Sequence, residues 1–234
     1  MLGMKAGAGA SLGQLDRMPL LIDQVRQAVS KHQPELHVST DGNDIVVDGV
    51  FVISSHEGPF DSYNVRMTLT AAFPLEEPRV FETGNRLPKI IDRHVFPSGA
   101  CCLGIWEEWL VTSDRSFDAF LTGVVHDYFV SQTYFELKGE WPFGERSHGN
   151  KGVYESYSEV LGIVTDESIV CGYLGILSQS AIKGHLLCPC GSGQRLRKCH
   201  IDRISELRAK IPTDLAKRML NRVRPKKTNW KLAR

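Results

Sequence analysis

Four potential metal ligands lie within thirteen residues near the end of the chain, and this feature constrains the fold more than any other. The stretch CPCGSGQRLRKCH has the spacing Cys-x-Cys-x8-Cys-His, and its donors are Cys188, Cys190, Cys199 and His200. Three thiolates and one imidazole form the donor set of a closed tetrahedral zinc site, which leaves no position for a substrate. We therefore expect a structural Zn²⁺. Unligated side chains are the alternative, but this density of donors is rare without a metal.

The same stretch resembles the short zinc motif at the carboxy terminus of the SecA translocation ATPase, a motif that recurs on many unrelated bacterial proteins. The resemblance covers about residues 186–202. It implies a structural zinc and a docking role rather than catalysis.

The composition indicates a soluble globular protein, with 42% hydrophobic residues, 24% charged residues and a net charge of +1. No stretch approaches the roughly 20 apolar residues of a membrane helix, and residues 1–14 form a loose Gly/Ala/Ser-rich leader without the apolar core of a signal peptide. We therefore expect a cytoplasmic protein with no membrane contact. In that reducing environment the six cysteines are thiols or metal ligands rather than disulfides.

The hydrophobic pattern predicts an α+β fold. Apolar residues at helical spacing predict a helix over 15–32, and a stronger amphipathic pattern predicts another over 116–136. The apolar stripe expected on this second helix consists of Phe117, Phe120, Leu121, Val124 and Tyr128. Between these helices the sequence predicts an antiparallel meander of four strands, at 36–40, 45–54, 63–73 and 79–82. Residues 83–114 show no sustained periodicity and are expected to be irregular and functional. Further helices are expected at 153–162 and 167–180, and a basic helix and tail after the zinc motif.

This order of elements resembles the ubiquitin-conjugating enzyme fold over roughly residues 15–136. The resemblance is carried by FPLEEPRVF (73–81), by HVFPSGACCLGIW (94–106) and by Trp109 ahead of the long helix. It implies a conjugating-type domain at 15–165 and a helical extension with the zinc motif at 166–234. Alignment on Cys-Leu makes Cys102 the thioester-forming residue, while Cys101 occupies the neighbouring packing position.

The reaction expected of Cys102 needs little activation of its thiol. Only the thiolate is nucleophilic, and a free cysteine leaves a few per cent thiolate at neutral pH. A thioester carrier needs an accessible sulfur on a rigid segment rather than a strong base. The alternative is that Cys102 is a buried small hydrophobe, the commonest fate of a free cysteine.

The family's His-Pro-Asn triplet is absent. Asp92, Arg93 and His94 occupy its three positions, so His94 stands where an asparagine stabilises the oxyanion, eight residues before Cys102. An imidazole N–H can donate to the same oxyanion, or the ring can act as a base. An ordinary hydrogen-bonded loop histidine remains the alternative.

The glycine-rich loop 137–152 contains possible auxiliary residues, namely Trp141, Glu145, Arg146 and His148. This loop either folds back over the cysteine to form one wall of a groove, or is a surface loop pinned by its tryptophan. Asp114 and Asp118 are interpreted as partners of a helix dipole and not as catalytic groups.

The sequence most resembles the stand-alone conjugating proteins of antiphage defence operons of the cyclic-oligonucleotide (CBASS) type. This resemblance implies an acyl or aminoacyl transferase whose donor is the C-terminal glycine of a partner nucleotidyltransferase (CD-NTase) or a ubiquitin-like protein. The acceptor would be a protein amine. The sequence has no ATP-binding glycine-rich loop, so the donor must arrive activated. Two alternatives are a non-catalytic module that binds a protein tail and a zinc-dependent nucleic-acid or ribosome adaptor, although nucleic acid is not the partner expected.

Overall fold

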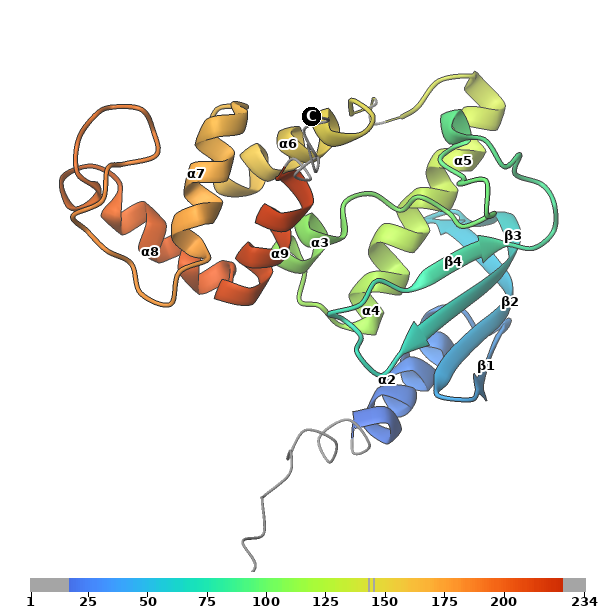
Figure 1. Ribbon diagram of the computed structural model, residues 1–234. Helices are drawn as coiled ribbons and strands as arrows, with labels where there is room; N and C mark the ends of the chain where they lie inside the picture. Colours follow the sequence, from blue (N-terminus) through green and yellow to red (C-terminus); the bar gives the residue numbers. More distant parts are fainter. Residues whose placement is uncertain (1–16, 143, 145, 225–234) are drawn as a thin grey trace, which may run out of the picture. The chain divides into compact units, whose positions relative to one another are not determined.

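The computed structural model describes residues 17–142, 144 and 146–224. Its single described sheet has four antiparallel strands in the order β1-β2-β3-β4, which lie side by side in Figure 1. The strands are Leu36–Asp41 (β1), Asp44–Ser55 (β2), Gly58–Thr70 (β3) and Arg79–Glu82 (β4). The predicted α+β class and antiparallel meander are therefore confirmed. The predicted leader, 1–14, and the tail after residue 224 lie outside the described residues.

Helices precede and follow the sheet in the sequence. They are Arg17–His32 (α2), Ile91–Arg93 (η1), Trp106–Thr112 (α3), Phe117–Ala119 (α4), Phe120–Val125 (η2), His126–Lys138 (α5), Asn150–Leu161 (α6), Glu167–Leu177 (α7), Leu196–Lys198 (η3), Ile201–Lys210 (α8) and Thr213–Val223 (α9). The expectation that residues 83–114 are irregular throughout is wrong at α3. Trp106, Trp109 and Leu110 have helical spacing, but seven residues are too few for a period to stand out.

The chain forms two compact units. Unit 1 contains the described residues of Met1–Trp106 and Ser113–Gly144, and unit 2 contains those of Glu107–Thr112 and Glu145–Arg234. The domain boundary predicted after residue 165 stays a prediction.

Unit 1 has its core between the sheet and α5. Phe51, Met67 and Phe129 are fully buried, because alternate residues of β2 and β3 point to one face of the sheet. The Phe129 ring of α5 lies 5.4 Å from the Phe51 ring and 4.7 Å from the Tyr63 ring. This aromatic contact fixes α5 against the sheet, and α5 in turn supports the segment that carries Cys102.

A π-helical segment, η2, interrupts the long helix of unit 1. The apolar stripe predicted for this helix included Val124, but Val125 is buried instead and Val124 is only half-buried. A π-helical turn contains an extra residue, which rotates the following residues around the helix axis. The predicted stripe is therefore correct at Phe117, Phe120, Leu121 and Tyr128, and it is displaced by one residue at Val124.

Unit 2 packs α7 against α9, with α6 beside both. Glu107 is 2% exposed, and its carboxylate accepts hydrogen bonds from Arg218 (2.8 Å) and from Arg222. Burial opposes ionisation of Glu107, but the charge of Arg222 and then of Arg218 outweighs burial, so its pKa lies below the ordinary value. Among the described residues, no helix is both long enough and apolar enough to span a membrane.

Candidate functional site

The cysteine segment, residues 90–103, follows β4 in unit 1 and is held to it by backbone hydrogen bonds. The Cys101 N–H donates to the Val80 carbonyl at 2.8 Å, and the segment folds back on itself where Phe96 N–H donates to the Ala100 carbonyl at 2.8 Å. An isolated antiparallel bridge joins Val95 to Cys101. This irregular stretch is therefore a fixed loop and not a free one.

The two adjacent cysteines have different environments. Cys101 is 7% exposed, and burial raises the pKa of its thiol to about 11, although the neighbouring Tyr128 hydroxyl opposes the shift. At neutral pH Cys101 is consequently a thiol and a poor nucleophile. Cys102 is partly exposed, and its N–H donates to the His94 carbonyl at 2.7 Å.

His94 lies beside Cys102 in the fold as well as near it in sequence. Its backbone is left-handed, with φ of 48° and ψ of 37°, a conformation that costs free energy for a residue other than glycine. Its carbonyl accepts hydrogen bonds from the Cys102 N–H and, at 3.1 Å, from the Tyr128 hydroxyl. Two donors from separate elements therefore hold His94 in this conformation.

Trp141 contacts His94. The centres of the two rings are 4.8 Å apart and the ring planes meet at 69°, an edge-to-face contact. Trp141 also lies 4.5 Å from the Phe135 ring of α5. The loop after α5 thus returns to the cysteine segment at this point, and the imidazole of His94 packs against an indole.

Gln132 anchors the residue before His94. Its fully buried amide donates to the Arg93 carbonyl at 2.8 Å and accepts from the Arg93 guanidinium at 2.9 Å. The same guanidinium lies 4.7 Å from the Phe135 ring, a cation–π contact. Neither Tyr128 nor Gln132 was predicted from the sequence to be a site residue. The sequence signal that could have identified Tyr128 and Gln132 is their four-residue spacing, which places both side chains on one face of a helix.

A second arginine forms ion pairs with acidic side chains on the surrounding surface. Arg86 donates to both carboxylate oxygens of Asp61, at 2.8 and 2.7 Å, and to Glu136 at 2.6 Å. These hydrogen bonds lower the pKa of Asp61 to about 2. Since Glu136 also lies 3.4 Å from Arg93, the two arginines are linked through one carboxylate of α5.

The four predicted metal ligands converge in unit 2. The ligand atoms of Cys188, Cys190, Cys199 and His200 all lie within 4.8 Å of one another. The Nδ1 atom of His200 is 3.3 Å from the Cys188 sulfur and 3.1 Å from the Cys199 sulfur. Hydrogen bonds from Ser192 lower the pKa of Cys190 to about 6, which favours the thiolate that a metal requires. The predicted donor cluster is confirmed, and its chemistry fits a structural Zn²⁺.

The other predicted residues lie elsewhere. In unit 2, Trp109 is half-buried, His148 is exposed, and Arg146 forms ion pairs with Glu108 and Glu159. Glu145 lies outside the described residues. Asp118 accepts a hydrogen bond from His32 at 2.9 Å, and Asp114 accepts one from the Ser116 N–H at 2.8 Å.

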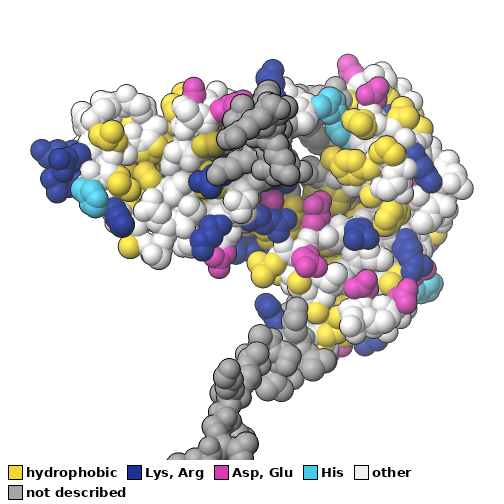
Figure 2. Space-filling view, in the orientation of Figure 1, with side chains coloured by type: hydrophobic (Ala, Val, Ile, Leu, Met, Phe, Trp, Pro, Cys, Tyr) yellow, Lys and Arg dark blue, Asp and Glu magenta, His cyan; other side chains and the backbone are white. Residues whose placement is uncertain are grey.

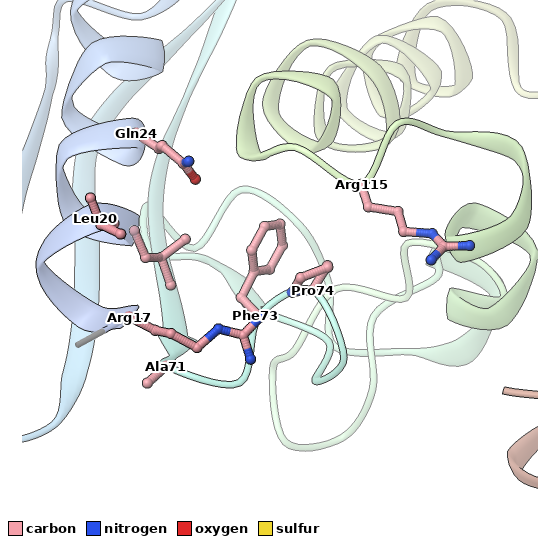
Figure 3. Close-up of a pocket in the computed structure, with 8 residues that line it drawn as sticks. Arg17, Leu20, Gln24, Ala71, Phe73, Pro74 and Arg115 are labelled. Atoms are coloured by element: carbon pink, nitrogen blue, oxygen red, sulfur yellow. The ribbon is translucent and has the colours of Figure 1, made fainter. Parts of the chain in front are cut away.

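A pocket of about 230 Å³ in unit 1, drawn in Figure 3, contains none of the predicted site residues. Its lining residues are Arg17, Leu20, Leu21, Gln24, Ala71, Phe73, Pro74 and Arg115.

Comparison with known proteins identifies one short motif. The family model described as the SEC-C motif matches residues 186–201, which include all four predicted metal ligands. No curated protein and no solved structure matches the chain. The match agrees with the resemblance to the zinc motif of SecA, and it leaves unit 1 without an assigned family.

Proposed function

We propose that this chain is a ubiquitin-conjugating-like acyl carrier, in which Cys102 holds the C-terminus of a donor protein as a thioester and passes it to an amine. The observation that carries the proposal is the inequality of the two cysteines. Cys101 is buried, with a thiol pKa of about 11, whereas Cys102 is partly exposed and bonded through its amide to His94. An irregular segment after a four-stranded meander, followed by a helix, also supports the resemblance to the conjugating fold.

The proposed reaction has two acyl-transfer steps, first a thioester exchange and then an aminolysis. The Cys102 thiolate attacks the carbonyl carbon of a preformed thioester, a new C–S bond forms, and the donor's thiol leaves as a thiolate. An amine nitrogen then attacks the Cys102 thioester, which forms a C–N bond and releases the Cys102 thiolate. The amine loses its proton to a base or to water. Since energy enters as a thioester, no ATP site is required in this chain.

His94 is the proposed partner of Cys102 in the transition state. Its imidazole either donates an N–H to the tetrahedral oxyanion or accepts the proton of the attacking amine. Packing against Trp141 and the two hydrogen bonds to the His94 carbonyl restrict its motion. Tyr128 and Gln132 are then positioning residues, because they act on the backbone around His94 and not on the substrate.

The donor class follows from the resemblance to conjugating proteins of CBASS defence operons. It would be the C-terminal glycine of a CD-NTase or of a ubiquitin-like protein, and the product would be a peptide or isopeptide bond. The SEC-C motif would hold a structural zinc and take no part in the transfer, because its four donors fill a tetrahedral site.

The test is a search for a covalent adduct in cells that express the chain with its operon neighbours. We expect a higher-mass species that reductant removes, that Cys102→Ala abolishes, and that Cys102→Ser converts into a reductant-stable ester. Cys101→Ala is the matched control and should retain the adduct. If Cys101→Ala alone abolishes it, the alignment is wrong by one residue. If function survives both alanine variants, the chain is a non-catalytic tail-binding module.

A further inference from the structure

The zinc loop, residues 183–200, has a surplus of positive charge. It contains no Asp or Glu, and the nearest carboxylates in the sequence are Glu167 and Asp202. Apart from the metal ligand His200, its basic side chains are all exposed, and they are Lys183, His185, Arg195, Arg197 and Lys198. Figure 2 shows Lys, Arg and His side chains gathered at this end of unit 2, with no Asp or Glu among them on the visible face.

Backbone pairing holds the basic residues of the zinc loop together. The Arg197 N–H donates to the Gly184 carbonyl at 2.9 Å, and an antiparallel bridge joins Leu187 to Arg195. A Cβ on Gly184 would lie only 3.1 Å from the Cβ of Arg197, so the two segments approach closely. Lys183 and His185 are therefore held beside Arg195 and Arg197 by the fold and not by chance.

These cations form no ion pair with any of the described residues. Several other arginines of unit 2 are engaged: Arg203 donates to the Leu161 carbonyl, and Arg218 to the Glu107 carboxylate. In contrast, the side chains of Lys183, Arg195, Arg197 and Lys198 make no ion pair or side-chain hydrogen bond with any described residue. Three thiolates around a divalent ion leave one net negative charge. One cation offsets it, so most of the positive charge is surplus.

We propose that the zinc loop binds a nucleic-acid strand through its phosphodiester backbone, without reading bases. A phosphate chain is held by Lys and Arg charge, and a guanidinium also donates to phosphate in a bidentate manner. A protein partner would need buried aromatic or apolar anchors, and the large apolar side chain that the described loop exposes is Leu187, at 69%. This surface is independent of Cys102 and goes beyond the proposed acyl transfer.

The experiment uses the full zinc-loaded chain and a fluorescein-labelled 20-nucleotide poly(U) RNA. Fluorescence anisotropy between 50 and 300 mM KCl should give a slope of log K against log salt of about −3, since four phosphate contacts contribute about −0.7 each. Arg195→Gln with Arg197→Gln should halve that slope and weaken binding about 25-fold at 0.1 M salt. Lys138→Gln with Lys151→Gln, two exposed lysines outside the loop, should change neither.

Metal analysis of each variant separates loss of charge from loss of zinc. Lys183→Gln lies outside the matched SEC-C residues, so it should keep the metal and still reduce the steepness of the slope by about 0.7. Unchanged binding in Lys183→Gln and in the double arginine variant would overturn the proposal. So would an equal loss in the control, or tighter binding to polyglutamate or to phosphatidylglycerol vesicles than to RNA. None of these outcomes depends on thioester formation.

Discussion

Replacing Gln132 with alanine removes the buried amide that holds Arg93 by both its backbone and its side chain. The change deletes the hydrogen bond to the Arg93 carbonyl at 2.8 Å and the one from its guanidinium at 2.9 Å. A neutral bond contributes about 1 kcal/mol and one to a charged group about 2 kcal/mol, so we expect a loss of about 3 kcal/mol in the free energy of unfolding. For a domain of this size that corresponds to a decrease in Tm of roughly 10 °C.

The assay for Gln132→Ala combines urea unfolding with hydrogen exchange followed by mass spectrometry. Peptides that cover residues 90–103 should exchange faster, because Arg93 and the His94 backbone lose their anchor, while peptides from β2 should change less. Gln27→Ala is the matched control, since Gln27 is exposed on α2, and it should stay within about 0.5 kcal/mol of the wild type. A Gln132→Ala protein as stable as that control would refute the reasoning.

Four further predictions concern other parts of the chain. Iodoacetamide at pH 8 should label Cys102 at least tenfold faster than Cys101, whose pKa of about 11 leaves roughly one thiolate in a thousand; equal labelling in a peptide map would contradict the assigned burial. Asp61→Asn should cost roughly 2 kcal/mol at pH 7. That cost should fade as the pH drops from 3.8, the ordinary pKa, through about 2, because a depressed pKa stabilises the fold only while the carboxylate is charged; a pH-independent cost in urea titrations would argue against this. Glu107→Gln should cost about 3 kcal/mol because it removes the buried negative charge that Arg218 and Arg222 contact, whereas the exposed control Glu206→Gln should cost less than 1 kcal/mol. Chelation of zinc should increase hydrogen exchange in residues 186–201 and leave the sheet protected, and uniform exchange throughout the chain would count against a local zinc site.

The local patterns in the sequence predicted the framework well. β-branched runs place three of the observed strands within one residue of the predicted ranges, whereas β3 begins five residues before its predicted start and ends three residues before its predicted end. Gly58 and Pro59 lie within β3 and not in a turn before it. The metal cluster was equally predictable from the sequence, because its four donors are close together in the chain and their residue types and spacing indicate a metal site. In both cases the determining contacts are local.

The environment of Cys102 was less predictable because long-range contacts create it. The sequence gives no direct indication that Gln132 reaches the Arg93 carbonyl, 39 residues away, or that Trp141 packs on His94. The π-helical turn at Phe120–Val125 also escapes a search for a 3.6-residue period, and it shifts burial from Val124 to Val125. The short helix α3 was also not predicted, because its helical spacing covers too few residues to be recognised in the sequence.

The most direct test of the proposed function is to identify the residue that carries the donor. The wild-type chain, isolated without reductant from cells that also contain the proposed donor protein, would be digested and analysed by tandem mass spectrometry. The proposal predicts a C-terminal glycine remnant joined to the Cys102 sulfur, and its loss on treatment with hydroxylamine. A remnant on Cys101, or an unmodified Cys102 in cells where the conjugated product accumulates, would contradict it.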